Sequence, residues 1–506
     1  MPSGGGDRRG PRGVRFWWVF PVFAALLLFR SRDLFTRLIV EEGDAAANSI
    51  LVEQAKGFSQ LVGNYSRIGF HHPGPGFLYV QAFGEWSLYD LLGLVPSPWN
   101  GQAVAILLLN AALVALAVTI VCRRLTPPSA GAWVLAAVAG AALLFFSSHY
   151  DLATSTWPPF AYFAPYLLLL AAAASVATGG VRDLWALALA GGLLVHGHAE
   201  FLFLATVVAV TAVGVLLRQH RGRIPALLRD NRRQLYLTGA VLAVFLLPIV
   251  VNLIRDWPGE FGKYLSYGKG HSANPVWHAA WYVLKLWDDN VLVAIPLMVI
   301  LFAAVVVAAR VTRHPYLRAG LAMSVLGLGS FLCYAVIGID SLNEHYIGFF
   351  TRAVPLFLLL LAVAAVAGRT HHAGRYLAVA LALTGLIAAL GSPALVNRRQ
   401  EVPDAPAALD VLAARLAPAQ PVVVQVAPIE SWAEAVPLAL TGHRRGMRIC
   451  FTNETLQLEA TPAYLCTADE LRVGLPVTVA RRGNDPAGLV RIAELNLSAV
   501  WAAPTP

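Results

Sequence analysis

Long apolar runs separated by polar segments fill most of the chain between residues 16 and 392. A helix that crosses a bilayer needs roughly 20 mainly apolar residues. On this criterion we predict eleven membrane helices, at 16–35, 101–121, 130–147, 160–177, 184–196, 199–217, 235–254, 291–310, 318–339, 352–368 and 375–392. The run at 184–196 is short, so it and 199–217 either both cross or form a hairpin that does not fully cross.

Arginine clusters mark every second polar segment. They are Arg8, Arg9, Arg12 and Arg15, then Arg123 and Arg124, then Arg182, then Arg218 to Arg233, then Arg310, Arg313 and Arg318, and finally Arg369 and Arg375. Lys and Arg are enriched in the cytoplasmic loops of membrane proteins. We therefore expect a multi-pass protein of the plasma membrane whose N-terminus is cytoplasmic. The start has no small-residue cleavage site after its apolar run, which predicts an uncleaved first helix.

The same topology places long polar segments on the opposite, extracytoplasmic side, above all 36–100, 255–290 and the tail from 393 to 506. The tail has helical periodicity at 406–417 and 431–447 and strand-like runs at 421–428 and 448–453. The predicted fold class is thus mainly α, a polytopic bundle of about eleven spans followed by a small extracytoplasmic α/β domain. The predicted domains are 1–392, which includes the first outer loop 36–100, and 393–506.

Composition supports a membrane protein and argues against nucleic-acid binding. Hydrophobic residues make up 57% of the chain and charged residues only 13%, too little charge to cover a soluble protein of 506 residues. The net charge of +9 comes from the short clusters between apolar runs and forms no single basic patch. The tail holds two of the four cysteines, Cys450 and Cys466, which form either a disulfide or two free thiols.

Unusual polar residues follow the first predicted helix. Glu41, Glu42 and Asp44 would lie at the membrane surface, where an ionised carboxylate is costly unless it is solvated, paired or used in function. The same loop contains His71-His72-Pro73-Gly74-Pro75. Adjacent histidines point in different directions and make a poor metal site, so we expect His71 or His72 to contact a phosphate or a sugar hydroxyl. A solvated helix end remains the alternative for the acids.

This layout resembles the GT-C superfamily of membrane glycosyltransferases. Its members have a first helix, an outer loop that opens with an acidic motif, juxtamembrane helices, further spans and often an outer C-terminal domain. Glu42-Gly43-Asp44 matches the ExD form of the motif. The resemblance implies transfer of a sugar from a polyprenyl-phosphate donor to a glycan or lipid acceptor. GT-C members differ in whether they need a divalent metal, and the sequence does not identify a ligand set.

The chemistry of this transfer needs few groups. A departing phosphate requires no strong general acid, so one base that deprotonates the acceptor and cations that hold the phosphate suffice. A direct displacement would invert the anomeric centre. By its place in the motif Asp44 is the predicted base, with Glu42 as its partner or substitute.

Cations and hydroxyls for the phosphate are predicted on several outer segments. Candidates are Arg67 in the first loop, Lys263, Tyr264, Lys269 and His271 in a Gly-rich loop, and His345 and Arg352 near 352–368. The alternatives are snorkelling lysines in an exposed loop and, for Arg352, a salt bridge to Glu344 or Asp340. His196, His198 and Glu200 alternate in another outer turn, where hydrogen bonds within a helical hairpin are favoured over a metal site.

Three other functions fit parts of this pattern. A transporter or flippase of lipid-linked sugars should show ionisable groups at mid-membrane and repeated halves, and neither is evident. A glycan ligase should have its large loop late in the chain. A non-catalytic envelope-assembly protein differs from an enzyme only in tolerating loss of Asp44. The Ala-, Arg- and Gly-rich composition indicates a GC-rich genome, such as that of an actinobacterium, and hence a pentofuranose or hexose donor.

Overall fold

The computed structural model describes residues 16–126, 131–270, 272–288, 290–369, 371–391 and 405–504. Within these residues the chain forms two compact units. The first, called here the helical unit, contains the described residues up to Arg32 and those from Ile106 to Gly391. The second, the mixed unit, contains Asp33–Ala105 together with the described residues of the tail.

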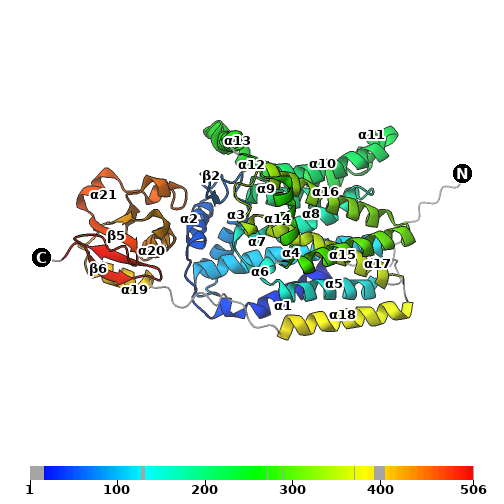
Figure 1. Cartoon of the computed structure of the whole chain (residues 1–506), viewed down its shortest axis with the longest axis horizontal. Helices are drawn as coiled ribbons and strands as arrows, with labels where there is room; N and C mark the ends of the chain where they lie inside the picture. The colour runs from blue at the N-terminus through cyan, green and yellow to red at the C-terminus, as the bar shows by residue number, and fades with distance from the viewer. Residues whose placement is uncertain are drawn as a thin grey trace. The chain divides into compact units, whose positions relative to one another are not determined.

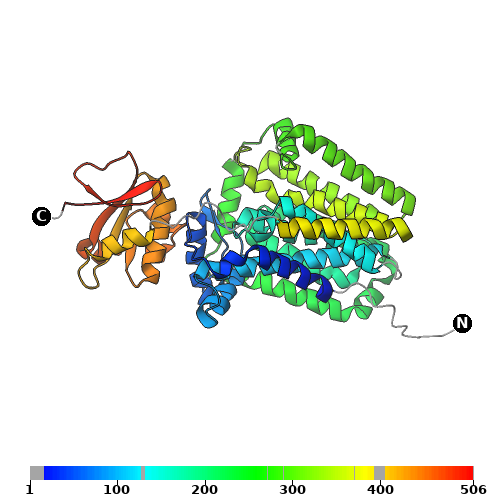
Figure 2. The same ribbon diagram turned by 90° about the horizontal axis from the view of Figure 1, so that it is seen from below.

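The long helices of the helical unit run alongside one another (Figures 1 and 2). They are α1 (Phe16–Arg30), α4 (Pro98–Leu125, which begins in the mixed unit), α5 (Gly131–Ser148), α8 (Phe163–Val176), α9 (Leu184–Gly197), α10 (Phe201–Gln219), α12 (Arg232–Arg255), α15 (Val291–Thr312), α16 (Pro315–Ile337), α17 (Ala353–Ala367) and α18 (His371–Gly391). Shorter elements connect them: α6 (Asp151–Thr154), α7 (Pro158–Ala161), α11 (Ile224–Asp230), α13 (Gly259–Gly270), α14 (Val276–Lys285) and the 3-10 turn η6 (His345–Arg352).

Each of the eleven segments predicted to be membrane helices is helical. Nine helices of the described part of the chain are long and apolar enough to cross a membrane, while α1 and α9 are shorter, at 15 and 14 residues. In the apolar stretch of α8, 89% of the residues are buried, against 6% in α12. Helix α8 therefore lies in the core of the bundle, and the apolar surface of α12 is available to lipid. The predicted polytopic bundle is confirmed.

Helices α5 and α18 approach so closely that only glycine fits at their crossing. A Cβ atom on Gly140 would lie 2.4 Å from the carbonyl oxygen of Leu381, and one on Gly385 would lie 2.3 Å from that of Gly140. Small residues that allow close backbone contact are the usual means of packing helices in lipid, where the hydrophobic effect does not drive helices together.

A five-stranded sheet forms the centre of the tail, with strand order β4-β3-β5-β7-β6. Its strands are β3 (Val422–Val426), β4 (Ile449–Phe451), β5 (Leu475–Arg481), β6 (Val490–Glu494) and β7 (Ser498–Ala502), and the helices are α19 (Ala405–Ala413), α20 (Trp432–Arg444) and α21 (Ala468–Val473). Strand β3 is parallel to both β4 and β5, whereas β7 is antiparallel to β5 and to β6. The four elements predicted in the tail are all present, which confirms a small α/β fold.

The first outer segment packs into the core of the tail. Helix α2 (Asp44–Lys56) contributes Ala46, Ala47 and Ile50 to the hydrophobic core built by the tail's sheet and by α19 and α20. Its other face packs through Leu51 and Ala55 on α3 (Gly76–Gly84). Our sequence-based division assigned 36–100 to the membrane domain, but its contacts group it with the tail. The division at residue 392 itself stays a prediction.

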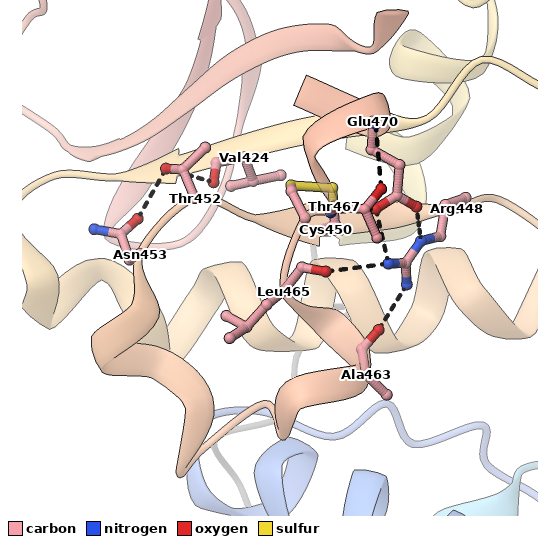
Figure 3. Close-up of a disulfide and its surroundings, with 10 residues drawn as sticks. Val424, Arg448, Cys450, Thr452, Asn453, Ala463, Leu465, Thr467 and Glu470 are labelled. Carbon is pink, nitrogen blue, oxygen red and sulfur yellow. Dashed lines mark hydrogen bonds and ion pairs between the residues drawn. A yellow bond between two sulfur atoms is a disulfide. The ribbon is translucent and has the colours of Figure 1, made fainter. Parts of the chain in front are cut away.

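The cysteines left open by the sequence form a disulfide between Cys450 and Cys466 (Figure 3). Arg448 reinforces this link: its Nε lies 2.6 Å from a carboxylate oxygen of Glu470, and its Nη1 donates to the carbonyl of Ala463 at 2.8 Å. Together they attach the connection after β4 to the sheet. Disulfides persist in oxidising compartments, outside the cytoplasm.

The packing of the first outer segment with the tail also constrains the topology. Parts of one compact unit lie on the same side of a membrane, so the chain must cross it an even number of times between them. Helices α4, α5, α8, α9, α10, α12, α15, α16, α17 and α18 separate the two parts. Helices α9 and α10 must therefore either both cross or both stay on one side. Because α10 has 19 residues and a mean hydropathy of 2.3, we infer that both cross.

Candidate active site

The acidic motif forms a tight turn in the mixed unit. Gly43 has φ of +49°, a conformation that side chains disfavour, and its N–H donates to the carbonyl of Ala433 in the tail at 3.0 Å. Asp44 is the first residue of α2, where the helix dipole favours a negative charge. Glu42 and Asp44 are both partly exposed. The turn thus presents the two predicted catalytic acids at the start of a buried helix.

Glu41, the third acid, is part of an ion-pair network. Its side chain is 2% exposed, and its two carboxylate oxygens lie 2.8 and 2.9 Å from Nη1 of Arg444. Nε of Arg444 lies 3.0 Å from a carboxylate oxygen of Glu53 on α2. Burial raises the pKa of Glu53, and Arg444 opposes this shift. Glu41 and Glu53 therefore join the first outer segment to α20.

Asp44 accepts a hydrogen bond from the phenol of Tyr65. Tyr65 belongs to β1 (Tyr65–Ser66), which pairs with β2 (Phe70–His71) so that Tyr65 lies opposite His71. The turn between these strands contains Gly69 at φ of +93°. The ring of Tyr65 lies edge-on to that of Trp432 in the tail, with centroids 5.9 Å apart. The sequence analysis missed Tyr65, although Gly69 between two polar–aromatic stretches is a hairpin signal.

A carboxylate of the tail joins this group. Burial raises the pKa of Glu459, the charge of Asp44 raises it further, and His71 opposes the shift. Glu459 is thus an electrostatic neighbour of both residues. No motif surrounds Glu459 in the sequence, and only the packing of the tail on α2 reveals it. We call Asp44, Tyr65, His71 and Glu459 the acidic site. Among the described residues no group of three His, Cys, Asp or Glu side chains is arranged to hold a metal ion.

The other predicted residues of the first loop differ in exposure. His72 is 4% exposed, its N–H donates to the carbonyl of Asn64 at 2.9 Å, and its ring lies 5.9 Å from that of Phe70. His71 is partly exposed, so the adjacent histidines occupy different environments. Arg67 is exposed on the hairpin.

The segment predicted as a Gly-rich phosphate loop is instead the helix α13. This prediction is wrong because four glycines spread over twelve residues do not prevent helix formation when aromatic residues pack between them. Lys263 is exposed and pairs with Glu260 at 2.9 Å, and burial raises the pKa of Tyr264, which packs beside Phe261. Lys269 lies on the same helix, and His271 lies outside the described residues.

Arg352 and His345 lie at the two ends of η6 in the helical unit. Nε of Arg352 donates to the carbonyl of Leu286 at 3.0 Å, and its guanidinium lies 5.0 Å from the ring centroid of Phe349. Burial lowers the pKa of His149, and the charge of Arg352 lowers it further. His345 is exposed, with its ring 6.0 Å from that of Tyr282.

The turn between α9 and α10 is held by hydrogen bonds, as expected for a hairpin. Nε2 of His196 lies 2.6 Å from the carbonyl oxygen of Phe245. Nδ1 of His198 lies 3.6 Å from a carboxylate oxygen of Glu200, whose side chain is 1% exposed. Burial raises the pKa of Glu200 well above its usual value. A neutral Glu200 fits a structural role in the hairpin.

Comparison with known proteins places the fold. No family model and no curated protein matches the chain. Among solved structures it is similar to the crystal structure of ArnT from Cupriavidus metallidurans in the apo state, with a TM-score of 0.60 and 15% sequence identity over 97% of this chain and 99% of that one. At this identity the likeness shows the fold alone. The chain therefore has an ArnT-like fold, and its long apolar helices are those of an integral membrane protein.

Proposed function

We propose that this protein is a membrane glycosyltransferase that moves a sugar from a polyprenyl-phosphate donor to a glycan or lipid acceptor of the cell envelope. The observation that carries the proposal is the acidic site. In a chain with an ArnT-like fold, the acid of the predicted motif starts a buried helix and accepts a hydrogen bond from Tyr65, which pairs with His71 across the hairpin, and its charge acts on a second carboxylate, Glu459. Ionisable groups gathered around one partly exposed turn, one of them with a raised pKa, favour a functional reason for keeping them.

Asp44 is the proposed base. Its carboxylate takes the proton of the acceptor hydroxyl while the acceptor oxygen bonds to the anomeric carbon. The bond from that carbon to the phosphate oxygen breaks on the opposite face, and its electron pair leaves with the polyprenyl phosphate, so the product is inverted. The hydrogen bond from Tyr65 orients the carboxylate. Glu42, one residue before Gly43, is the proposed partner or substitute.

The phosphate is the natural ligand for the predicted cations. Arg352 favours this role because its guanidinium is already held by a carbonyl and an aromatic ring, which limits the entropy lost on binding. Arg67, Lys269, His72, Tyr264 and His345 remain proposed contacts. Lys263 is a weaker choice because Glu260 already neutralises it.

The disulfide supports an extracytoplasmic position for the mixed unit. The acidic site would then face the outer side, where envelope polymers are assembled. A transporter is less well supported, since Glu200 lies between the ends of α9 and α10 and not at the centre of a span. The Asp44→Asn experiment described next distinguishes an enzyme from a non-catalytic scaffold.

The test uses the full-length protein in nanodiscs with polyprenyl-phosphate arabinofuranose and polyprenyl-phosphate mannose as separate donors and alkyl glycosides as acceptors. We expect transfer with one donor and its loss, by 100-fold or more, in Asp44→Asn, about the contribution of a general base. The matched control is Asp410→Asn, an exposed acid of the tail. Transfer by Asp44→Asn at the normal rate, with the control also active, would refute the base assignment.

A further inference from the structure

One arginine of the tail, Arg444, forms ion pairs with the first outer segment, about 400 residues away along the chain. Arg444 contacts Glu41 across 403 residues and Glu53 across 391 residues. Its side chain is 21% exposed and that of Glu41 only 2%. Burial by itself lowers the pKa of Arg444, but Glu41 and Glu53 outweigh burial and raise it, so the guanidinium stays charged.

We propose that Arg444 is a positioning residue for catalysis: the tail, through α20, fixes the acidic turn and thereby sets the orientation of Asp44. This inference rests on the proposed function, since it assigns to the tail a task in the same reaction. Arg444 touches neither substrate nor reacting atoms in this scheme, and it acts through Glu41 and the backbone of the turn.

Both ends of α20 contact the first outer segment. At its start, the carbonyl of Ala433 receives the N–H of Gly43, and the ring of Trp432 packs on Tyr65, the residue that donates to Asp44. At its end, Arg444 holds Glu41 and Glu53. Helix α20 therefore runs along α2 in the same direction and contacts the chain before Asp44, at Glu41 and Gly43, and the helix after it, at Glu53.

The turn needs such external support. Gly43 adopts φ of +49° and ψ of −123°, a region open to glycine, whose backbone also has other conformations of similar energy, and α2 has no side-chain cap at its N-terminus. Asp44 then sits at the joint between an extended strand of chain and the helix. If Glu41 were released, rotation about the Gly43 backbone would swing the carboxylate by more than the small displacement that an active site tolerates.

The tail has other means of holding its own fold. Arg445 pairs with Asp410 at 2.8 Å, Arg448 pairs with Glu470 at 2.6 Å, and Cys450 is linked to Cys466. These links are internal to the tail, whereas those of Arg444 lead to the first outer segment. Replacing Arg444 should therefore disturb the turn more than the tail, and the adjacent Arg445 provides a matched control.

The first experiment measures steady-state rates of full-length Arg444→Met, Arg444→Lys and Arg445→Met. For Arg444→Met we expect kcat to fall by about 10- to 100-fold with KM changed less than about twofold, because a misplaced base slows the chemical step. Arg444→Lys retains the charge and should recover part of kcat. Arg445→Met should stay within about twofold of the unchanged protein. Equal effects of Arg444→Met and Arg445→Met on kcat would overturn the inference. So would a fall in activity that is explained entirely by a smaller amount of folded protein.

The second experiment needs no substrate and keeps the inference separate from the proposed function. Hydrogen exchange of peptides covering residues 38–50 should accelerate in Arg444→Met, while peptides of β3 and β5 keep their protection. Unchanged exchange at 38–50 means that Arg444 does not fix the turn, whatever Asp44→Asn does to transfer. Conversely, accelerated exchange together with a fully active Asp44→Asn would show that Arg444 fixes the turn, but would refute the proposed base and with it the catalytic purpose of that contact.

A third variant avoids the risk that Arg444→Met misfolds. In Gly43→Ala the new Cβ meets only the Cβ of Ala433, at 3.9 Å, so no clash arises and only the positive φ is penalised. The turn should shift without loss of the tail, and kcat should fall with KM retained. Normal kcat in Gly43→Ala would show that the geometry of the turn does not control the reaction, and the inference would fail.

Discussion

Removing the disulfide should loosen one defined part of the tail. Cys450 and Cys466 close a loop with a sequence separation of 16. The entropy that such a link removes from the unfolded chain is about 10 cal/mol/K, or about 3 kcal/mol at 25 °C, by the loop-closure relation. Since 1.36 kcal/mol is a factor of ten, the protection of the linked segment should fall by roughly 150-fold.

Hydrogen exchange of the full-length protein checks this value directly. Peptides covering β4 and residues 452–467 are compared in the unchanged protein and in the double variant Cys450→Ala, Cys466→Ala. The control is Cys333→Ala, because Cys333 is free and exposed, and it should change nothing in these peptides. A fall in protection of less than about fivefold would show that Arg448 and the sheet hold the segment unaided, and the entropic reasoning would be wrong.

Three further predictions concern single contacts. Tyr65→Phe removes the donor to Asp44 and should lower kcat by about tenfold with no change in melting temperature, measured by transfer assay and calorimetry. Gly140→Leu forces α5 away from α18 and should lower the stability of the helical unit by about 1–3 kcal/mol, measured as a lower melting temperature. Hydrogen bonds, first from Arg448 and then from Thr467, lower the pKa of Glu470 to about 2, so stability present above the unfolded value near 4.5 should be lost as pH falls towards 2, and Arg448→Met should weaken this dependence in pH-resolved hydrogen exchange.

Each of these three predictions has a control. A Cβ atom on Gly191 has no other atom within 4 Å, so the control Gly191→Leu should lower the melting temperature much less than Gly140→Leu. Equal effects at Gly140 and Gly191 would contradict the crossing geometry. Tyr89→Phe is the control for Tyr65→Phe. A similar fall in kcat in both variants would mean that Tyr65 has no specific role. A pH dependence that is unchanged in Arg448→Met would assign it to other carboxylates.

The bundle was predictable because lipid imposes a simple rule on the sequence. A spanning helix must be apolar for about 20 residues, so each span leaves a run that composition alone reveals. The tail followed from the same logic in water, since the apolar run in 421–428 reflects a strand buried on both faces and the periodicity of 431–447 reflects a helix buried on one face. The segment of α13 was mispredicted as a loop because the prediction relied on its glycines. The spacing of Phe261 and Tyr264, which pack against each other on the helix, indicated a helix instead.

The candidate site was only half predictable. Asp44, Glu42 and His71 stand out locally, because charged and His residues next to an apolar run are unusual. Tyr65 and Glu459 do not, because an isolated Tyr or Glu in a polar segment has no signature of its own. Tyr65 joins the site through the hairpin of the first outer segment, and Glu459 joins it through the packing of segments nearly 400 residues apart, of which a single sequence contains no record.

That pairing explains how the two ends of the chain come to share one task. Ten long helices lie between the acidic motif and the tail, yet the two segments pack in one compact unit. Helix α2 then buries Ala46, Ala47 and Ile50 in the tail's core, so the first segment does not fold independently of the last. A helix completed in this way can hold Gly43 in one of the several conformations that glycine would sample in a free loop. The tail thus acts on Asp44 through packing and the Arg444 ion pairs, which is the reason to expect that damage to α20 lowers kcat before it lowers binding.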